Sequence, residues 1–163
     1  MSTPRLARAE DAEAMARVHY DAWQEGYRGI LPTSLLAGMS LERRVEFWHR
    51  RWPGTLVVED EAGDVVGISS CGAPRDGGEP PSVGELYMIN VAPSAWGTGV
   101  SRSLLDAAVR RLRDSGYMYA YLWVLEPNRR ARRFYERSGW RCDDGRKLHE
   151  RSGVMEVRYR RDL

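Results

Sequence analysis

Residues 84–105, GELYMINVAPSAWGTGVSRSLL, are the stretch that decides the fold. The apolar run in the first half is bounded by a glycine and a proline, which is typical of a buried strand. Gly97 and Gly99 follow, and glycine permits backbone angles that other residues resist. Apolar residues then recur at helical spacing. The sequence therefore predicts a strand, a sharp turn, and a helix that begins near Gly99 or Val100.

The turn between this strand and this helix is a candidate anion site. The first amides of a helix have no acceptor within the helix, and the helix dipole adds positive potential, so phosphate oxygens are attracted there. The pattern is not a P-loop, because no Gly-Lys-Ser/Thr follows. It is not the dinucleotide fingerprint either, because Arg102 stands at the third glycine position. A plain strand–helix turn that binds nothing is the alternative.

Length and composition limit what the chain can be. Its 163 residues suit one domain over residues 1–163, and 25 basic against 23 acidic residues argue against a nucleic-acid partner. No apolar run reaches the ~20 residues of a membrane span, and the N-terminus lacks a signal peptide. We therefore expect a cytoplasmic protein without a membrane partner. Cys71 and Cys142 are too few for a disulfide framework or a zinc site, and we expect no metal.

Hydrophobic periodicity and turn residues predict the other elements. The N-terminal part contains a strand within residues 3–9 with Leu6 inward, a helix that is capped by Asp11 and runs to about Glu25, a loop over residues 23–32 and a helix after Ser40. The remaining elements are a hairpin (56–59 and 65–70), a mobile polar loop (73–82), the strand and helix of residues 84–116, a strand (119–125), a short helix capped by Asn128, a strand (140–142), a charged loop (143–153) and a last strand (154–159). The order β-α-α-β-β-β-α-β-α-β-β suits an α/β (α+β) domain with a mixed sheet covered by helices on both faces.

Two motifs within this order resemble the GCN5-related N-acetyltransferase (GNAT) family. Residues 91–101, VAPSAWGTGVS, resemble the acetyl-CoA-binding segment of that family, usually written Q/R-x-x-G-x-G/A. Gly99 matches, whereas Trp96 replaces Gln or Arg and Ser101 replaces Gly or Ala. Residues 128–140, NRRARRFYERSGW, look like the family's N-x-x-A-x-x-x-Y-x-x-x-G-F/W ending. The order of elements is also that of the family. The resemblance implies a GNAT-like, largely antiparallel sheet of six to seven strands.

The resemblance further implies an acetyl-CoA-dependent N-acetyltransferase. A primary amine, on a small molecule or on a peptide or protein, would attack the thioester of acetyl-CoA directly in a ternary complex. In the family the central strand splays from the next strand, the cofactor enters the gap, and the backbone N–H near Val91 would stabilise the oxyanion. The residues that the resemblance assigns to cofactor binding are Ile89, Asn90, Val91, Gly97, Thr98, Gly99, Val100, Ser101, Arg102, Asn128 and Tyr135.

Two residues are candidates for proton transfer. By resemblance, Tyr135 protonates the departing thiolate, and Glu85 at the start of the central strand is the general base. The alternatives are that Tyr135 is only a packed aromatic, that Glu85 lies in solvent or accepts from an arginine, and that a water chain deprotonates the amine. Asp76 and Glu79 in the polar loop are further candidates for the base.

The sequence leaves the acceptor open. Its site would be lined by residues 23–31, the second helix and residues 143–153, and Trp23, Tyr27 and Trp48 would form an aromatic wall if they face it. An antibiotic, a polyamine, an amino acid and a protein N-terminus or lysine all remain candidates. A homodimer is a reasonable expectation, because exposed strand edges tend to be covered.

Two further alternatives stay open at the level of sequence. The chain could be a non-catalytic module that binds acyl-CoA and serves as a sensor or interaction domain. The short helix after Asn128 carries a basic run, which is a solvated face, attracts the phosphates of coenzyme A or, as the least favoured reading, binds nucleic acid. This run consists of Arg129, Arg130, Arg132 and Arg133.

Overall fold

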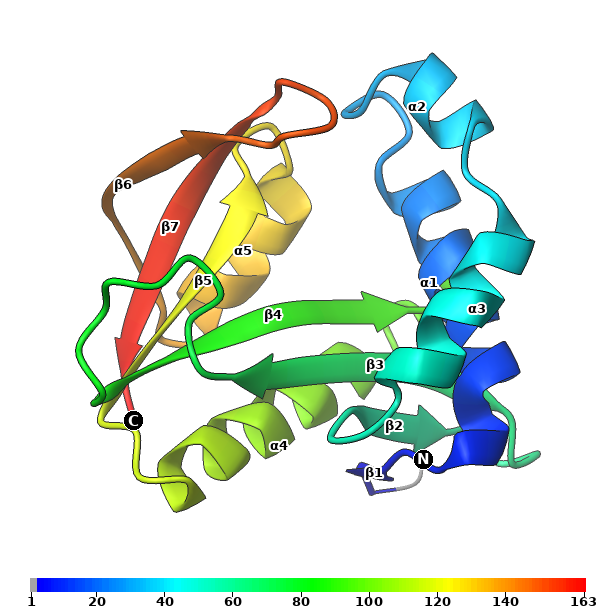
Figure 1. The fold of residues 1–163 in the computed structure, drawn as a ribbon, viewed down its shortest axis with the longest axis horizontal. Coiled ribbons are helices and arrows are strands. Elements are labelled where there is room, and N and C mark those ends of the chain that lie inside the picture. The colour runs from blue at the N-terminus through cyan, green and yellow to red at the C-terminus, as the bar shows by residue number, and fades with distance from the viewer. Residues whose placement is uncertain (1–2) are drawn as a thin grey trace.

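One mixed sheet organises the chain, and the computed structural model describes it over residues 3–163. Its seven strands have the spatial order β1-β2-β3-β4-β5-β7-β6 (Figure 1). The strands are β1 (Arg5–Leu6), β2 (Leu56–Glu59), β3 (Val65–Gly72), β4 (Val83–Val91), β5 (Tyr119–Leu125), β6 (Arg141–Leu148) and β7 (Met155–Asp162). The helices are α1 (Ala12–Gly26), α2 (Thr33–Ala37), α3 (Leu41–Arg51), α4 (Val100–Asp114) and α5 (Arg129–Arg137), with two 3-10 turns, η1 (Ala9–Asp11) and η2 (Pro93–Ala95).

The pairing of β4 with β5 is parallel and short. Residues 83–85 pair with residues 119–121, and every other neighbouring pair of described strands is antiparallel. Beyond Glu85 the two strands diverge, and Figure 1 shows β4 running across the molecule while β5 runs upward. The predicted fold class, a largely antiparallel mixed sheet with helices on both faces, is confirmed.

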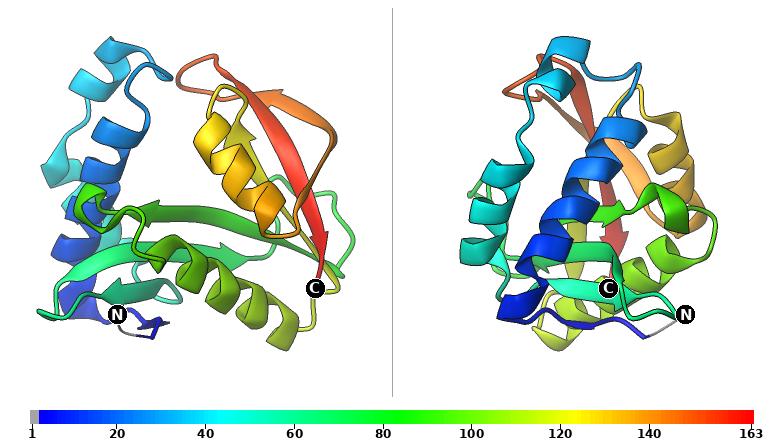
Figure 2. Two further views of the ribbon diagram at one scale, coloured as in Figure 1. Left: turned by 180° about the vertical axis from the view of Figure 1, so that it is seen from behind. Right: turned by 90° about the vertical axis from the view of Figure 1, so that its right-hand side faces the viewer.

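Helices cover the sheet from two sides (Figure 2). On one side lie α4 and α5, where Leu104 and Leu112 of α4 are buried against the sheet. On the other lie α1 and α3, where Met15 and Trp48 pack against β2 and β3. Burial of each such apolar side chain stabilises the fold by roughly 1.5–3 kcal/mol relative to exposure. Across residues 3–163, no helix combines the length and the apolar character that crossing a membrane requires.

The N-terminus of α4 is fixed in place by a glycine on β3. A Cβ atom on Gly67 would lie 2.6 Å from Cγ1 of Val100 and 2.9 Å from Cδ1 of Leu104. The strand and the helix therefore approach closely only because that atom is absent. Val100 is the first residue of α4, and Gly67 pairs with Val91 at the end of β4. The start of the helix is thus held beside the end of β4.

A bulge bends β4 near its middle. Ser70 of β3 pairs with Met88, but the next residue, Cys71, pairs with Leu86, so Tyr87 is an extra residue on β4. Such a bulge bends a strand and increases its twist. The bend comes just after the residues that pair with β5, and it therefore contributes to the divergence of the two strands.

The structure corrects four local predictions. Asp11 does not cap the first helix with its side chain, because its carboxylate accepts from the amide of Arg8 instead. Leu6, predicted to point inward, is 51% exposed, because β1 is a two-residue strand at the edge of the sheet. The first helix ends at Gly26, one residue beyond its predicted end, so residues 23–26 of the predicted loop are helical, and a short helix, α2, follows the loop. Residues 143–148, predicted as part of a charged loop, belong to β6. β6 is the other edge strand, where charged side chains can point to solvent and no apolar pattern is needed.

Candidate active site

The open edge of β4 is the first part of the site. The amide of Ala92 donates a 2.8 Å hydrogen bond to the carbonyl of Val66 on β3. Main-chain groups alternate in direction along a strand, so those of Asn90 also face β3, whereas those of Ile89 and Val91 face away. Because β5 has already diverged, Ile89 and Val91 present their strand groups to the space between β4 and β5. This edge can pair with an extended ligand that contains amides.

Asn90 contributes its side chain to the site, because its main-chain groups face β3. The side chain is 8% exposed and lies in the wall of the cleft described below. Its buried Nδ2 donor has no hydrogen-bond partner within residues 3–163. An unsatisfied buried donor costs about 1–3 kcal/mol, so a ligand that accepts from this amide would be stabilised.

The turn after β4 carries a row of free main-chain donors. Gly97 and Gly99 have φ angles of 78° and 92°, which favour glycine. Within the described part of the chain, the amides without a main-chain acceptor in this turn are those of Gly97, Gly99, Val100, Ser101 and Arg102. They lie at the N-terminus of a 15-residue helix, whose dipole adds positive potential. The geometry suits an anion such as a diphosphate.

The side chains of this turn are mostly engaged elsewhere. The hydroxyl of Thr98 donates to the carbonyl of Ala95 at 2.6 Å, and the guanidinium of Arg102 pairs with Asp106 at 3.0 Å. Ser101 is the one residue of 98–102 in the cleft wall. An anion would therefore be held here by main-chain groups.

Trp96 of the turn connects the end of β4 with α5. Its indole N–H donates a 2.9 Å hydrogen bond to the carbonyl of Val91, and the guanidinium of Arg130 on α5 lies 4.1 Å from its ring centroid. These three residues all line the cleft. Arg130 thus places a positive charge on the side of the cleft where the free amides lie.

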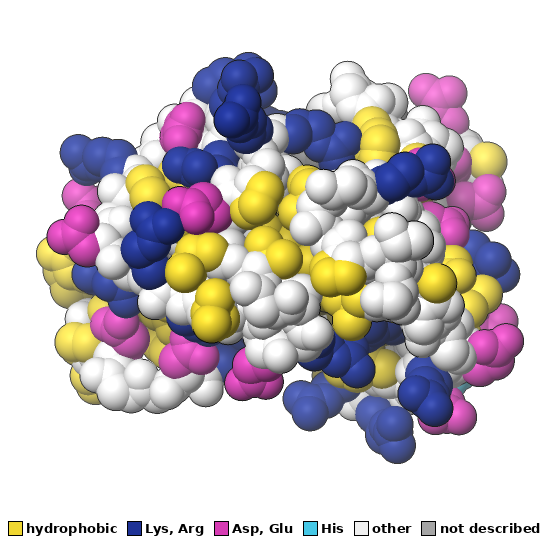
Figure 3. Space-filling view, turned by 90° about the horizontal axis from the view of Figure 1, so that it is seen from above, with side chains coloured by type: hydrophobic (Ala, Val, Ile, Leu, Met, Phe, Trp, Pro, Cys, Tyr) yellow, Lys and Arg dark blue, Asp and Glu magenta, His cyan; other side chains and the backbone are white. Residues whose placement is uncertain are grey.

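A cleft of about 750 Å³ extends along the open edge of β4. Its wall combines residues from both sides of the sheet. They include His19, Trp23, Tyr27, Phe47, Ile89, Asn90, Val91, Trp96, Gly97, Ser101, Trp123, Asn128, Arg130, Tyr135, Lys147, His149 and Glu156. Seen from above, hydrophobic side chains gather near the middle of the molecular surface, between groups of Lys and Arg (Figure 3).

Asn128 and Tyr135, from the second motif, both line the cleft. The side-chain oxygen of Asn128 caps α5 by accepting from the amide of Ala131 at 3.1 Å, which leaves its Nδ2 for a ligand. The hydroxyl of Tyr135 makes no hydrogen bond within residues 3–163. Burial raises the pKa of Tyr135 above its ordinary value, and Tyr27 adds to the shift. Tyr135 is therefore protonated at neutral pH, with its hydroxyl unused by the protein.

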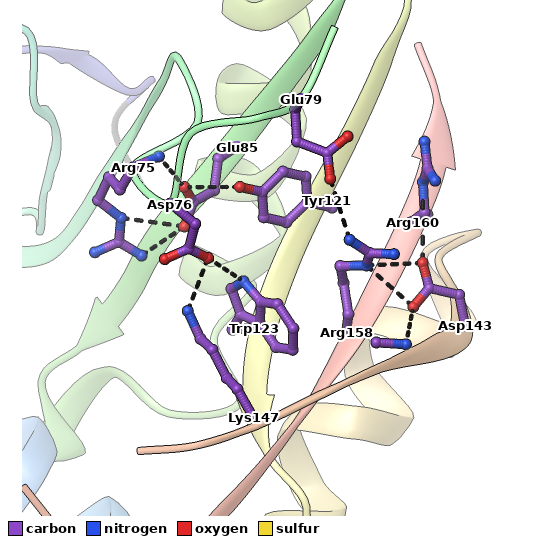
Figure 4. Close-up of polar contacts among 11 residues, drawn as sticks. Arg75, Asp76, Glu79, Glu85, Tyr121, Trp123, Asp143, Lys147, Arg158 and Arg160 are labelled. Carbon is purple, nitrogen blue, oxygen red and sulfur yellow. Dashed lines mark hydrogen bonds and ion pairs between the residues drawn. The ribbon is translucent and has the colours of Figure 1, made fainter. Parts of the chain in front are cut away.

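Glu85 lies outside the cleft wall. It is 1% exposed, and its carboxylate accepts from the main-chain amide of Arg75 at 2.7 Å, from the Arg75 guanidinium at 2.6 Å and from the Tyr121 hydroxyl at 3.3 Å (Figure 4). Of the alternatives that the sequence leaves open for Glu85, this is the one in which it accepts from an arginine. The ion pair anchors the β3–β4 loop to the start of β4.

The polar loop over residues 73–82, predicted to be mobile, is tied to the sheet at further points (Figure 4). Asp76 accepts from Lys147 at 2.9 Å, and Glu79 pairs with Arg158 at 3.1 Å. Both carboxylates are therefore neutralised by cations of β6 and β7. Neither Asp76 nor Glu79 offers an unpaired base.

Trp23 and Tyr27 lie in the cleft wall, but Trp48 does not. Trp48 is 2% exposed in the core, and its neighbour Phe47 lines the cleft in its place. The indole N–H of Trp48 donates to Nδ1 of His19 at 3.2 Å, so the neutral imidazole carries its proton on Nε2. Burial lowers the pKa of His19 to about 3, and this residue is therefore uncharged at neutral pH.

Sequence reasoning missed Glu156, a carboxylate on β7. It is half-buried in the cleft wall, and its carboxylate has no hydrogen-bond or ion-pair partner within residues 3–163. Burial raises the pKa of Glu156, against the opposing effect of His149 and Lys147. The alternation of β7 places Glu156 on the face opposite the buried Val157, but a single strand pattern does not show that this face borders the cleft.

The described residues contain no group of three or more His, Cys, Asp or Glu side chains placed to hold a metal ion. Cys71 and Cys142 are free thiols.

Comparison with known proteins gives the family. Residues 15–140 match the Acetyltransferase (GNAT) family. The chain is 33% identical over 129 residues to the uncharacterized N-acetyltransferase YuaI of Bacillus subtilis (strain 168), across 78% of this chain and 74% of that protein. It is also 39% identical over 87 residues to a mycothiol acetyltransferase of Propionibacterium freudenreichii subsp. shermanii. That match covers 53% of this chain but only 27% of the relative.

Solved structures agree with the fold. The PaiA N-acetyltransferase of Thermoplasma acidophilum, in complex with coenzyme A, superposes over the full length of both chains with a TM-score of 0.76 at 17% identity. A ribosomal-protein-alanine N-acetyltransferase of Brucella melitensis does so over 99% of this chain and 100% of its own, with a TM-score of 0.75 at 23% identity. From the sequence match and the shared fold together, the chain belongs to the GNAT family of acetyltransferases.

Proposed function

We propose that this protein transfers the acetyl group of acetyl-CoA to a primary amine by direct attack in a ternary complex. The observation that carries the proposal is the continuity of one cleft, which joins the free amides at the start of α4 to the open edge of β4. Family membership supports it, as do structural neighbours solved with coenzyme A or, for the YncA putative acetyltransferase of Salmonella typhimurium, with acetyl-CoA.

The free amides of residues 97–102 would bind the pyrophosphate of acetyl-CoA, and Arg130 would add positive charge beside them. The pantetheine arm carries amides, so it can pair with the main chain of Ile89 and Val91 as an added strand would. Asn128 would donate its free Nδ2 to the same arm. In this placement the thioester comes to lie between the end of β4 and α5.

The reaction needs the thioester and the amine to be held together, which removes much of the entropy cost of a bimolecular step. The amide of Val91 would donate to the thioester carbonyl as its oxygen becomes negative, an effect whose loss typically costs 10²–10³-fold in rate. As the C–N bond forms and the C–S bond breaks, the hydroxyl of Tyr135 would donate to the sulfur. A raised pKa makes the phenol a weaker acid, so its main contribution is a hydrogen bond to the developing thiolate. We leave Glu85 outside the reaction.

Calorimetry with acetyl-CoA, followed by release of free coenzyme A with a panel of primary amines, tests this function. We expect micromolar binding, turnover with some of the amines, and a Tyr135→Phe variant whose turnover falls by about 10²-fold or more while its affinity for acetyl-CoA is kept. Binding without turnover for any amine would favour the alternative, a non-catalytic acyl-CoA-binding module. Equal rates in the Tyr135→Phe variant would remove Tyr135 from the mechanism.

A further inference from the structure

Glu156 lies opposite a lysine that does not pair with it. In the register of the sheet, Glu156 faces Lys147 of β6 on one side and Leu125 of β5 on the other. The ammonium of Lys147 is instead 2.9 Å from Asp76 and 4.4 Å from the centroid of the Trp123 ring. The cross-strand cation is thus drawn to the β3–β4 loop, and the carboxylate of Glu156 is left without a partner.

The other charges of the cleft wall are engaged or exposed. Arg75 pairs with Glu85, and Arg130 stacks on Trp96. Glu150 and Arg151 lie exposed in the β6–β7 turn. Glu156 is therefore the half-buried charge of the cleft that has no partner among residues 3–163. Burying a carboxylate is costly unless it is paired, so a cationic ligand would be stabilised there.

Aromatic rings line the same cleft as this carboxylate. Trp23 and Tyr27 meet in a T-shaped contact with centroids 4.9 Å apart, and the ring of His149 from the β6–β7 turn lies 6.3 Å from Trp23. Burial raises the pKa of Tyr27 to about 12, and the charge of Glu156 adds to the shift. Tyr27 in turn raises the pKa of Tyr135. Tyr27, Glu156 and Tyr135 all line this one cleft.

We propose that Glu156 binds the ammonium group of the acceptor and takes its proton, and that the acceptors are primary amines with an aromatic or apolar body. The inference rests on the proposed function. The aromatic wall of Trp23, Tyr27 and Phe47 would contact the apolar body of the acceptor. Such rings also attract a nearby cation, which adds to the binding of the ammonium group. One proton of the ammonium passes to the Glu156 carboxylate, and the neutral nitrogen then attacks the thioester carbon. As the C–S bond breaks, the nitrogen loses its second proton, coenzyme A leaves as the thiol that carries this proton, and Glu156 returns the first proton to solvent.

This role makes activity depend on pH. Glu156 must be ionised to bind the cation and to accept its proton. The titratable and charged groups that interact with it electrostatically are Tyr27 at the C-cap of α1, Lys147 of β6, His149 of the β6–β7 turn, and Arg75 and Asp76 of the β3–β4 loop. Burial raises the pKa of Glu156, so the acid limb of kcat/KM should lie above the range of an ordinary glutamate.

The test compares phenethylamine with 2-phenylethanol, a neutral analogue of similar shape. Each is titrated by calorimetry into the full chain saturated with coenzyme A, which cannot react. We expect the wild type to bind phenethylamine at least about tenfold more tightly than the alcohol. In Glu156→Gln the affinity for the amine should fall roughly 10- to 100-fold and the preference should disappear. Glu61→Gln, which removes an exposed charge in the β2–β3 turn, should behave as the wild type.

Two further measurements separate a site effect from misfolding and from failure of the proposed function. Acetyl-CoA affinity should be the same in Glu156→Gln as in the wild type, and Glu156→Asp, which keeps the charge, should restore part of the preference for the amine. If the wild type binds acetyl-CoA and acetylates some amine, two results would overturn this inference alone. One is an unchanged preference for phenethylamine over 2-phenylethanol in Glu156→Gln, and the other is no binding of phenethylamine to the wild type. Absence of acetyl-CoA binding to the wild type would overturn the proposed function with it.

Discussion

The carboxylate of Glu85 lies 2.6 Å from the guanidinium of Arg75, and the acid is 1% exposed while the arginine side chain is 57% exposed. Glu85 is thus covered by the β3–β4 loop, to which Arg75 belongs. A general base must reach the acceptor through the cleft, and the oxygens of Glu85 are directed to Arg75 and Tyr121 instead. The ion pair with Arg75 therefore predicts that Glu85 contributes to the stability of the fold rather than to proton transfer.

We expect Glu85→Gln to lower the free energy of unfolding by about 1–3 kcal/mol, because the side chain keeps an acceptor but loses the charge that Arg75 and its amide are placed to satisfy. Turnover by the folded variant should stay within about threefold of the wild type. Denaturant unfolding and steady-state kinetics measure the two quantities. Glu79→Gln should cost less stability, because the carboxylate of Glu79 is 23% exposed and that of Glu85 is 1% exposed. A fall of 100-fold or so in turnover with unchanged stability would instead restore Glu85 as the base.

Arg130 should contribute to cofactor affinity through its position over Trp96. In Arg130→Ala the cleft loses a positive charge near the free amides and a cation–π contact of about 0.5–1 kcal/mol. We predict that the dissociation constant of acetyl-CoA rises roughly three- to tenfold and depends less on salt. Calorimetry at two ionic strengths measures both. Arg133→Ala, an exposed arginine of the same helix, is the matched control, and an equal effect of the two variants would show that only net charge matters.

His19 should make the fold sensitive to acid. Its pKa is lowered from 6.5 to about 3 by burial, so between these values the unfolded chain binds a proton that the folded chain does not. Stability should therefore fall as the pH is lowered through this window, by up to about 1.4 kcal/mol per pH unit for one proton. His19→Gln keeps an acceptor for the Trp48 indole but cannot titrate. Its stability should change less between about pH 6.5 and pH 4.5, in urea unfolding curves. Equal slopes for the two proteins would contradict the assignment.

Local patterns in the sequence predict the elements that carry the cofactor motifs. The apolar run, the glycine turn and the helical spacing give β4 and α4, and β5 occupies the predicted residues 119–125. The prediction that Asn128 caps α5 is also correct, because its side chain accepts a hydrogen bond from the amide of Ala131 three residues later. Each of these features depends on residues close together in the chain.

The remaining features depend on partners distant in the chain. β6 carries charged residues because it is an edge strand, and its strand character comes from pairing with β7. The helical pattern of α3 places both Phe47 and Trp48 near α1, and only the packing decides that Phe47 faces the cleft. The isolation of Glu156 results from the pairing of Lys147 with Asp76, 71 residues away. Such relationships cannot be derived from spacing.

The central claim is that main-chain amides at the start of α4 hold the cofactor, and calorimetric titration of Ser101→Asp with acetyl-CoA tests it most directly. A carboxylate in the first turn favours the helix dipole, by typically 0.3–1 kcal/mol, so the thermal midpoint should not fall. The same carboxylate repels a diphosphate at the free amides, and we predict that the dissociation constant rises by roughly 100-fold or more, whereas Ser103→Asp, outside the cleft wall, has little effect. Acetyl-CoA binding to Ser101→Asp as tight as to the wild type would contradict the account.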